Sequence, residues 1–136
     1  MSYLLDPNVC IALINGSSSK IRTRFIQAVH RHAELTTSLI VAHELWYGVA
    51  KSQQVARNAN ALTVFLSREV ALLDYSEQDA QAAGEIRADL ERRGERIGEY
   101  DTLIAGQAFS RNLILVTANT REFGRVKGLI VEDWTT

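Results

Sequence analysis

Short apolar segments alternate with longer amphipathic segments along this chain, and the alternation limits the possible folds more than any other feature. The apolar segments span 3–5, 35–37, 70–75, 113–117 and 129–133. The segments between them carry apolar residues at helical spacing, as Val55, Ala59 and Leu62 do. Strands that alternate with helices favour a parallel sheet with helices on both faces. We therefore expect an α/β fold, a three-layer α/β/α sandwich around a mainly parallel sheet of about five short strands.

Segment 113–117 is the most apolar, and we expect it to be a central strand, whereas 70–75 is expected to be a buried strand. Helices are expected over 9–14, 21–32, 40–52, 53–68, 76–94 and 100–110. Ser19 is the expected N-cap of the second helix, and Ser76 with Asp79 resembles a capping pair. Gly94 is typical of a helix C-terminus. In the helix over 21–32, the expected buried side contains Ile21, Phe25, Ala28 and Val29.

The composition indicates a single compact domain over 1–136, because 46% of the 136 residues are hydrophobic. No apolar run is long enough to span a membrane, and no basic segment followed by an apolar one suggests a secretory signal. Cys10 is the only cysteine, so we expect a core thiol and a reducing cytoplasm. The formal net charge of −1 does not by itself indicate a nucleic-acid-binding protein.

Four acids fall where ligands bind in parallel sheets, beyond the carboxyl ends of the strands. Asp6 ends the first strand, Glu44 lies on the helix after the second, Asp101 begins a helix, and Glu122 follows 113–117. Each has an ordinary structural alternative. Asp6 before Pro7 suits an N-cap, Asp101 suits a helix N-terminus, and Glu122 suits a polar turn. Glu44 is less ordinary, because apolar residues flank it and an unpaired buried charge is costly.

Taken together, the four acids indicate a divalent cation, because carboxylates gathered at one edge would otherwise repel one another. Oxygen ligands select Mg²⁺ or Mn²⁺ over softer metals. Zinc is disfavoured, since the chain has no CxxC or HExxH motif, and His30, His32 and His43 lack partners at ligand spacing. His43 is expected to be an ordinary surface or core histidine.

Four segments, read in order, resemble a known family. They are YLLDPNVC, VAHELWYGVAKS, IGEYDTLIAGQA and LVTANTREFGRVKGLIVEDW, and together they run from residue 3 to residue 134. They resemble the PIN-domain ribonucleases and, among these, the VapC toxins of bacterial toxin–antitoxin pairs, in particular the enteric-type group. Each segment is weak alone, but four at the family's spacing make the resemblance strong.

The resemblance implies a PIN-like fold and a metal-dependent endoribonuclease that is neutralised by a VapB-type antitoxin. It implies Asp6, Glu44, Asp101 and Glu122 as catalytic metal ligands, with Mg²⁺ or Mn²⁺ bound. Asn8, Thr117 and Asn119 would be supporting polar groups. The substrate would be tRNA or ribosomal RNA, with tRNA the first choice, and a homodimer is expected. An antitoxin groove is expected around Trp46, Tyr47, Ile21 and Phe25, which could equally be core residues.

Two positions depart from the family's pattern. Pro7 and Ala118 stand where relatives usually have threonine and asparagine, and Pro7 removes a hydroxyl and a backbone donor near the expected metal. With the four acids neutralised by metal, the rest of the chain has a net positive formal charge. Candidate phosphate contacts are Arg93, Arg96, Arg121 and Arg125, each of which could also be ordinary surface charge.

Two other functions fit parts of the pattern. A phosphatase of the haloacid-dehalogenase type also begins with an aspartate after the first strand, but it needs a second aspartate where this chain has Asn8. A catalytically impaired PIN-like binding domain is the other alternative, because of Pro7. A covalent aspartyl-phosphate would identify the first, and absence of metal-dependent RNA cleavage the second.

Overall fold

A five-stranded parallel sheet forms the centre of the computed structural model, which describes all 136 residues. The strand order is β3-β2-β1-β4-β5, and every neighbouring pair is parallel. The strands are β1 (Ser2–Leu5), β2 (Glu34–Ser38), β3 (Ala71–Leu73), β4 (Ile114–Val116) and β5 (Val131–Glu132). All five therefore end at the same edge of the sheet, which is the edge where ligands bind in folds of this kind.

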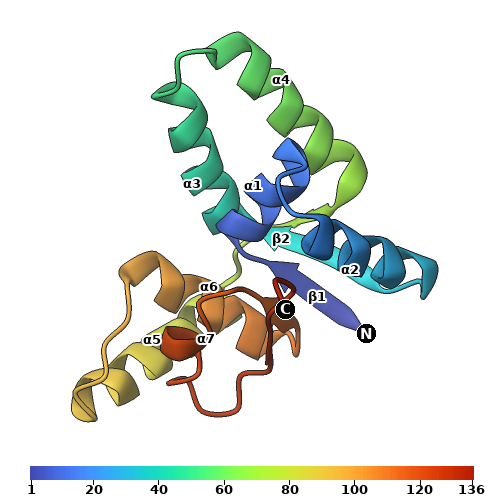
Figure 1. Ribbon diagram of the computed structural model, residues 1–136. Helices are drawn as coiled ribbons and strands as arrows, with labels where there is room; N and C mark the ends of the chain where they lie inside the picture. Colours follow the sequence, from blue (N-terminus) through green and yellow to red (C-terminus); the bar gives the residue numbers. More distant parts are fainter.

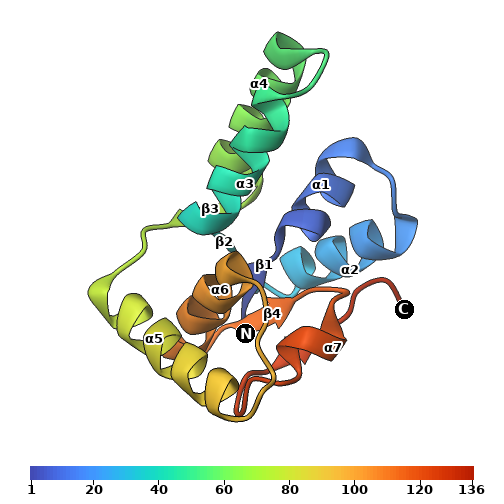
Figure 2. The same cartoon turned by 90° about the vertical axis from the view of Figure 1, so that its left-hand side faces the viewer.

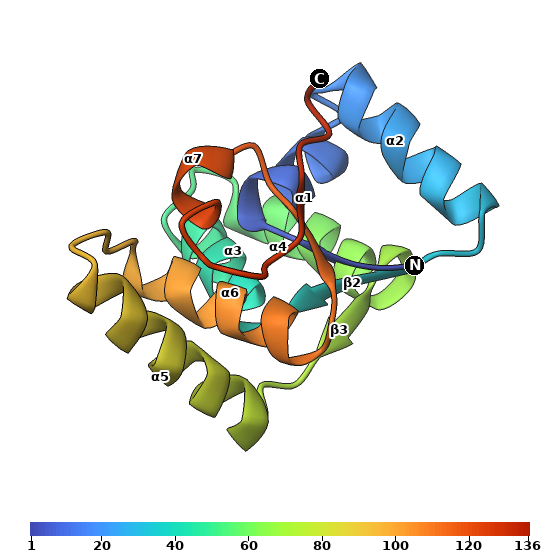
Figure 3. The same ribbon diagram turned by 90° about the horizontal axis from the view of Figure 1, so that it is seen from below.

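Helices cover both faces of the sheet, as the alternation predicted. They are α1 (Pro7–Asn15), α2 (Ser19–His30), α3 (Leu39–Ala50), α4 (Val55–Val64), α5 (Glu77–Arg92), α6 (Glu99–Ser110) and α7 (Thr120–Phe123). Helices α1, α2 and α4 lie on one side and α5 and α6 on the other (Figures 1 and 3). Helices α3 and α4 form an antiparallel pair that projects beyond the sheet (Figure 2). The three-layer α/β/α sandwich is confirmed.

The core lies between the sheet and its two helical layers. Leu4, Leu5, Leu115 and Val116 of the two inner strands are completely inaccessible to solvent. The Tyr3 ring meets the Trp134 ring edge to face at 5.3 Å between centroids, which attaches the C-terminal segment to the middle strand. Burial of this continuous apolar surface is the main force that stabilises the fold.

Some local expectations were wrong, each for a physical reason. The segment over 70–75 is an edge strand rather than a buried one, because nothing pairs with the outer side of β3, and Leu72 is 40% exposed. The strand over 113–117 is internal, but the middle position belongs to β1. Ser18, not Ser19, caps α2 by accepting from the Ile21 N–H.

Two further differences concern helices. Val29 is 47% exposed, so the buried side of α2 is narrower than its sequence suggested. The helix expected over 53–68 is α4 followed by a π-helical turn, Phe65–Glu69, before the chain enters β3. By contrast, Ser76 and Asp79 form the expected capping box of α5, and Gly94 adopts a left-handed φ of 66° just after that helix.

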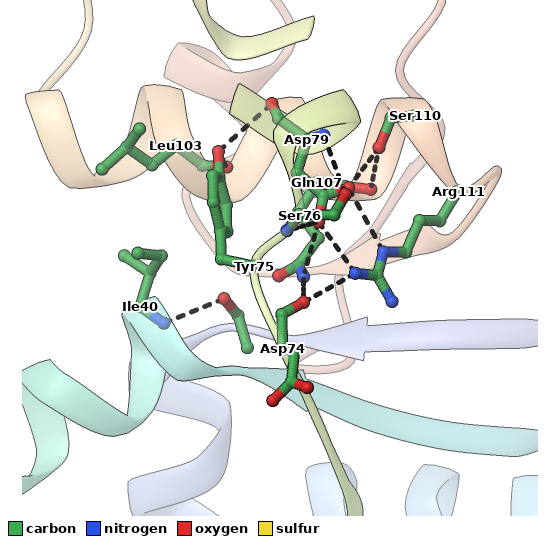
Figure 4. Close-up of polar contacts among 10 residues, drawn as sticks. Ile40, Asp74, Tyr75, Ser76, Asp79, Leu103, Gln107, Ser110 and Arg111 are labelled. Carbon is green, nitrogen blue, oxygen red and sulfur yellow. Dashed lines mark hydrogen bonds and ion pairs between the residues drawn. The ribbon is translucent and has the colours of Figure 1, made fainter. Parts of the chain in front are cut away.

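Helices α5 and α6 approach each other very closely. A Cβ atom on Gly106 would lie 2.6 Å from the backbone of Ala83, so only glycine fits at this crossing. Beside the crossing, Asp79 is fully buried and binds the Arg111 guanidinium, with an Oδ2···Nη2 distance of 2.8 Å. Ser76, Gln107 and Ser110 add hydrogen bonds to the same carboxylate (Figure 4).

The pKa of Asp79 shows how well this charge is compensated. Burial alone would raise it, but the hydrogen bonds from Arg111, Ser110 and Ser76 hold the pKa well below its usual range. The carboxylate therefore remains ionised at neutral pH, and its contribution to stability is lost only as the pH falls below the ordinary value for aspartate.

We expect Asp79→Ala to lower the free energy of unfolding by about 3–5 kcal/mol at pH 7, because it leaves the Arg111 charge and the α5 capping site unpaired. Urea unfolding followed by circular dichroism would measure this loss. Asp74→Ala is a control, since the exposed Asp74 hydrogen-bonds to the cluster only through its backbone carbonyl and its side chain acts on Arg111 through charge alone. Equal stability of Asp79→Ala and the parent would contradict the structural role of the cluster.

Two chain-wide expectations can be compared with the structure. Cys10 is a buried core residue, and burial raises the pKa of its thiol to about 12, so the thiol stays protonated and unreactive. Among the helices, none combines the length and the apolar character needed to cross a bilayer.

Candidate functional site

Asp6 lies at the centre of the carboxyl-terminal edge of the sheet, directly after β1. Its backbone N–H donates to the Val116 carbonyl of β4, which extends the pairing of the two inner strands by one residue. Its carboxylate Oδ1 accepts from the Val9 N–H at 2.9 Å, so Asp6 is the N-cap of α1. The side chain is only 5% exposed, and this burial raises its pKa. Asp6 therefore fills the ordinary capping role as well as lying at this edge.

Proline follows Asp6 because the first helical position does not need a backbone donor. Pro7 is the first residue of α1, where its fixed φ fits and its missing N–H costs nothing. Asn8 is exposed at the same helix start, and its backbone N–H is a further hydrogen-bond donor that lowers the pKa of Asp6. Its side chain thus stands in solvent next to the acid.

Thr117 and Glu122 approach Asp6 from the end of β4 and from the short helix that follows it. Thr117 is completely buried, and its side chain hydrogen-bonds to the Asp6 carboxyl group, which lowers the pKa of that acid. The same hydroxyl accepts from the Asn119 N–H at 3.0 Å. The Asn119 side chain donates to the Glu122 Oε2 at 3.3 Å. One chain of contacts therefore connects Asp6 with the turn that carries Glu122.

Glu44 and Asp101 face the same region from α3 and α6. Desolvation raises the pKa of Glu44, and the charges of Asp101 and Asp6 raise it further. Desolvation also raises the pKa of Asp101, together with the charges of Glu122 and Asp6. Asp6, Glu44 and Asp101 thus act on one another, and the charge of Glu122 acts on Asp101.

The four acids nevertheless do not form a ready-made ligand sphere. No group of three or more His, Cys, Asp or Glu side chains is arranged so that it could hold a metal ion as it stands. The donors fit a hard divalent cation in chemistry, and burial, with neighbouring negative charge as a smaller cause, raises the pKa of three of them, a cost that such a cation would reduce. Ligation would require these side chains to turn toward one another.

Asp133 is an acid that sequence reasoning did not select. It follows β5 at the same edge of the sheet, and its charge raises the pKa of Asp6. Hydrogen bonds from Thr135 lower its own pKa, so it remains ionised. Its position directly after the last strand could have identified it, but the strand was expected over 129–133, a range that includes Asp133.

The four candidate arginines have different surroundings. Arg121 is exposed, and no ion pair of the chain includes it. Arg96 is also exposed, with one long contact of 3.8 Å to Glu91. Arg93 is instead bonded to two acids of its own neighbourhood, and it also donates to a backbone carbonyl, as does Arg125. Arg93 is therefore fully occupied, Arg125 is held by one bond to a backbone carbonyl, and Arg96 and Arg121 make no hydrogen bond through their guanidinium groups.

An open groove begins at Glu44 and runs between α1, α3 and α4. It encloses about 770 Å³, and its walls combine apolar residues such as Ile11 and Leu45 with polar residues such as Arg57. Beside the acids, the exposed side chains of His43 and Tyr100 contact each other, with a Nε2···Oη distance of 3.3 Å. His43 is therefore a surface residue, as expected.

Comparison with known proteins identifies the family of the chain. The family model for the PIN domain matches residues 3–129. The chain is 42% identical to the tRNA(fMet)-specific endonuclease VapC of Shigella flexneri, over 99% of both proteins. It is 38% identical to ribonuclease VapC2 of Rickettsia felis, over 98% of both.

Solved structures show the same fold over nearly the full length. VapBC2 from Rickettsia felis, bound to a promoter DNA fragment, contains a chain that matches with a TM-score of 0.90 and 36% identity, over 98% of this chain and 99% of that one. DNA-bound VapBC from Salmonella typhimurium matches with a TM-score of 0.89 and 42% identity, over 98% of each chain. The chain therefore belongs to the PIN-domain family and, within it, to the VapC group.

Proposed function

We propose that this protein is the toxin of a type II toxin–antitoxin pair, a divalent-metal-dependent endoribonuclease whose site is formed by Asp6, Glu44, Asp101 and Glu122. The observation that carries the proposal is the electrostatic coupling of these acids at one edge of the sheet. Carboxylates that are partly buried and act on one another in this way are unfavourable without a cation. The family match gives no support to the alternative phosphatase chemistry.

Each residue has a distinct part in the proposed reaction. Asp6 and Asp101 would hold Mg²⁺ or Mn²⁺ directly, and Glu44 and Glu122 would complete the set. When bound, the ion supplies positive charge to the phosphoryl group and makes water a better nucleophile at neutral pH. Thr117 fixes the Asp6 carboxyl group through its hydroxyl. Two exposed amides beside the acids can donate to phosphate oxygens, those of Asn8 and Asn119.

The proposed substrate is a structured RNA, with tRNA as the first choice. The relatives from Shigella flexneri and Salmonella typhimurium are named as tRNA(fMet)-specific endonucleases, and each is 42% identical to this chain. Without metal the site would repel a polyanion, so cation binding and RNA binding should be coupled. Arg96 and Arg121 are free to contact phosphates outside the acids. The active unit is proposed to be the single domain over 1–136, working in the cytoplasm as a homodimer.

A VapB-type antitoxin is the partner, and the groove that begins at Glu44 is its proposed docking site. A flexible segment that folds on binding needs an apolar channel with polar ends, and this groove has both. Trp46 and Tyr47 are exposed on the same helix, α3, and remain candidates for contact. Ile21 and Phe25 belong to the core, with exposures of 5% and 8%, so they do not provide the surface expected there.

We expect Asp6→Asn and Asp101→Asn each to reduce Mn²⁺-dependent cleavage of tRNA by at least about 100-fold, because each removes a charged metal ligand. An asparagine in place of Asp6 can still cap α1, so the fold should be retained. Cleavage rates on purified tRNA, with cut positions mapped by sequencing RNA ends, measure the effect. The control is Glu85→Gln, which removes one charge from the exposed surface of α5. Full activity in both aspartate variants would remove the basis of the assignment.

The repulsion also predicts a stability change. In EDTA at pH 7.5, Asp101→Asn should raise Tm by about 2–4 °C, because it removes a charge that is destabilised first by burial and then by repulsion from Glu122 and Asp6. Since the pKa of Asp101 is raised in the folded state, the gain should shrink as the pH falls through that pKa toward its ordinary value. Mn²⁺ should stabilise the parent more than the variant. Thermal denaturation would check this, and a lower Tm for the variant at pH 7.5 would show that Asp101 is not under repulsion.

A further inference from the structure

Two of the arginines first considered as phosphate contacts have a different geometry from the rest. Arg93, at the end of α5, donates through Nη2 to the backbone carbonyl of Arg125 at 2.7 Å. Arg125, in the loop after α7, donates through Nη1 to the backbone carbonyl of Arg96 at 2.9 Å. The two bonds run in opposite directions between the same two loops. We refer to this reciprocal pair as the arginine clamp.

The Arg93 side chain has little capacity left for a ligand. Its Nε donates to Asp89 Oδ2 at 3.0 Å, and its Nη1 donates to Glu95 Oε1 at 3.1 Å. With Nη2 shared between Asp89 and the Arg125 carbonyl, all three nitrogens have partners, and the side chain is only 24% exposed. A guanidinium with this many partners acts as a fixed crosslink.

The segments joined by the clamp are those that carry two of the proposed metal ligands. The loop over 94–98 leads into α6, whose third residue is Asp101. Arg125 lies just after α7, and its backbone N–H donates to the Glu122 carbonyl. Figure 2 shows the loop after α7 passing close to the end of α5.

Neither helix begins with a side-chain cap. No side chain caps α6 at Gly98 or α7 at Asn119. Helix α7 has four residues, too few to be stable without outside contacts. Phe123 and Val126 bury the apolar side of its turn in the core. The clamp is the direct polar connection between the two.

We propose that Arg93 and Arg125 are positioning residues, which hold Glu122 against Asp101 so that both can ligate the metal. The inference rests on the proposed function for the identity of the site, but not for the mechanical connection. It replaces the expectation that these two arginines contact RNA. Phosphate contact is left to Arg96 and Arg121, which keep largely free guanidinium groups.

The test compares Arg93→Ala, Arg125→Ala and the two lysine variants with the parent. We expect the alanine variants to bind Mn²⁺ about 10-fold more weakly in the absence of RNA, as measured by electron paramagnetic resonance. Amide hydrogen exchange should become faster in 94–101 and 120–126 only. For cleavage, kcat should fall, while KM and its dependence on salt should stay close to those of the parent.

Lysine separates the two roles of the side chain. A lysine ammonium keeps the charge that a phosphate contact needs, but it cannot reproduce the fork that joins Asp89, Glu95 and the Arg125 carbonyl. Arg93→Lys should therefore resemble Arg93→Ala in Mn²⁺ affinity. The matched control is Arg92→Ala, because Arg92 is 71% exposed and has only a 3.9 Å contact to Asp89. That control should leave affinity and exchange unchanged.

Several results would overturn the proposal. Unchanged Mn²⁺ affinity in the alanine variants, with a higher KM and a weaker salt dependence, would return both arginines to phosphate binding. Faster exchange with unchanged affinity would reduce the clamp to a purely structural contact. If Arg93→Ala does not fold, Arg125→Ala decides, since it removes a single bond. If the parent cleaves no RNA, the proposed function fails, while exchange and Mn²⁺ binding still decide the clamp.

Discussion

The burial of an ionisable carboxyl group at the end of the middle strand is the constraint on which the rest of this structure depends. Asp6 is almost inaccessible, and a charge in that position is costly unless other groups compensate it. The Val9 N–H and the Thr117 hydroxyl compensate part of the cost. Glu44, Asp101 and Asp133 add to it, because they bring further negative charge to the same edge. The fold thus leaves negative charge at this edge that its own residues only partly compensate, and a divalent cation would suit such a place.

The acids stay close together only if the helices that carry them are held in place. The packing of α5 against α6 holds one of these helices, α6. The Gly106–Ala83 crossing sets the distance between the two helices, and the Asp79–Arg111 cluster fixes their far ends. The arginine clamp fixes the near end, where α6 begins with Asp101. Two groups of compensated charge therefore hold in place a third group that is left uncompensated.

Local patterns predicted the fold well, because short-range spacing determines strands, helices and caps. The capping box of Ser76 and Asp79 is an example, since both partners lie within one turn. Prediction failed where the answer depended on distant neighbours. The apolar run over 70–75 does not show that β3 has an empty outer side. Nothing near Arg93 in sequence reveals that the Arg125 carbonyl lies against it, and Asp133 was hidden at the end of an expected strand.

The double duty of Asp6 has an evolutionary consequence for a protein that harms its own cell. Asparagine caps a helix as well as aspartate does, yet it brings no charge to a metal. Aspartate and asparagine codons differ by a single base. If Asp6 is the metal ligand proposed above, a single transition would give a chain that still folds and still fills its place in a complex but lacks that ligand. The hydrogen bond from the Val9 N–H can be accepted by the side-chain oxygen of asparagine as well, so α1 would still begin at the same residue.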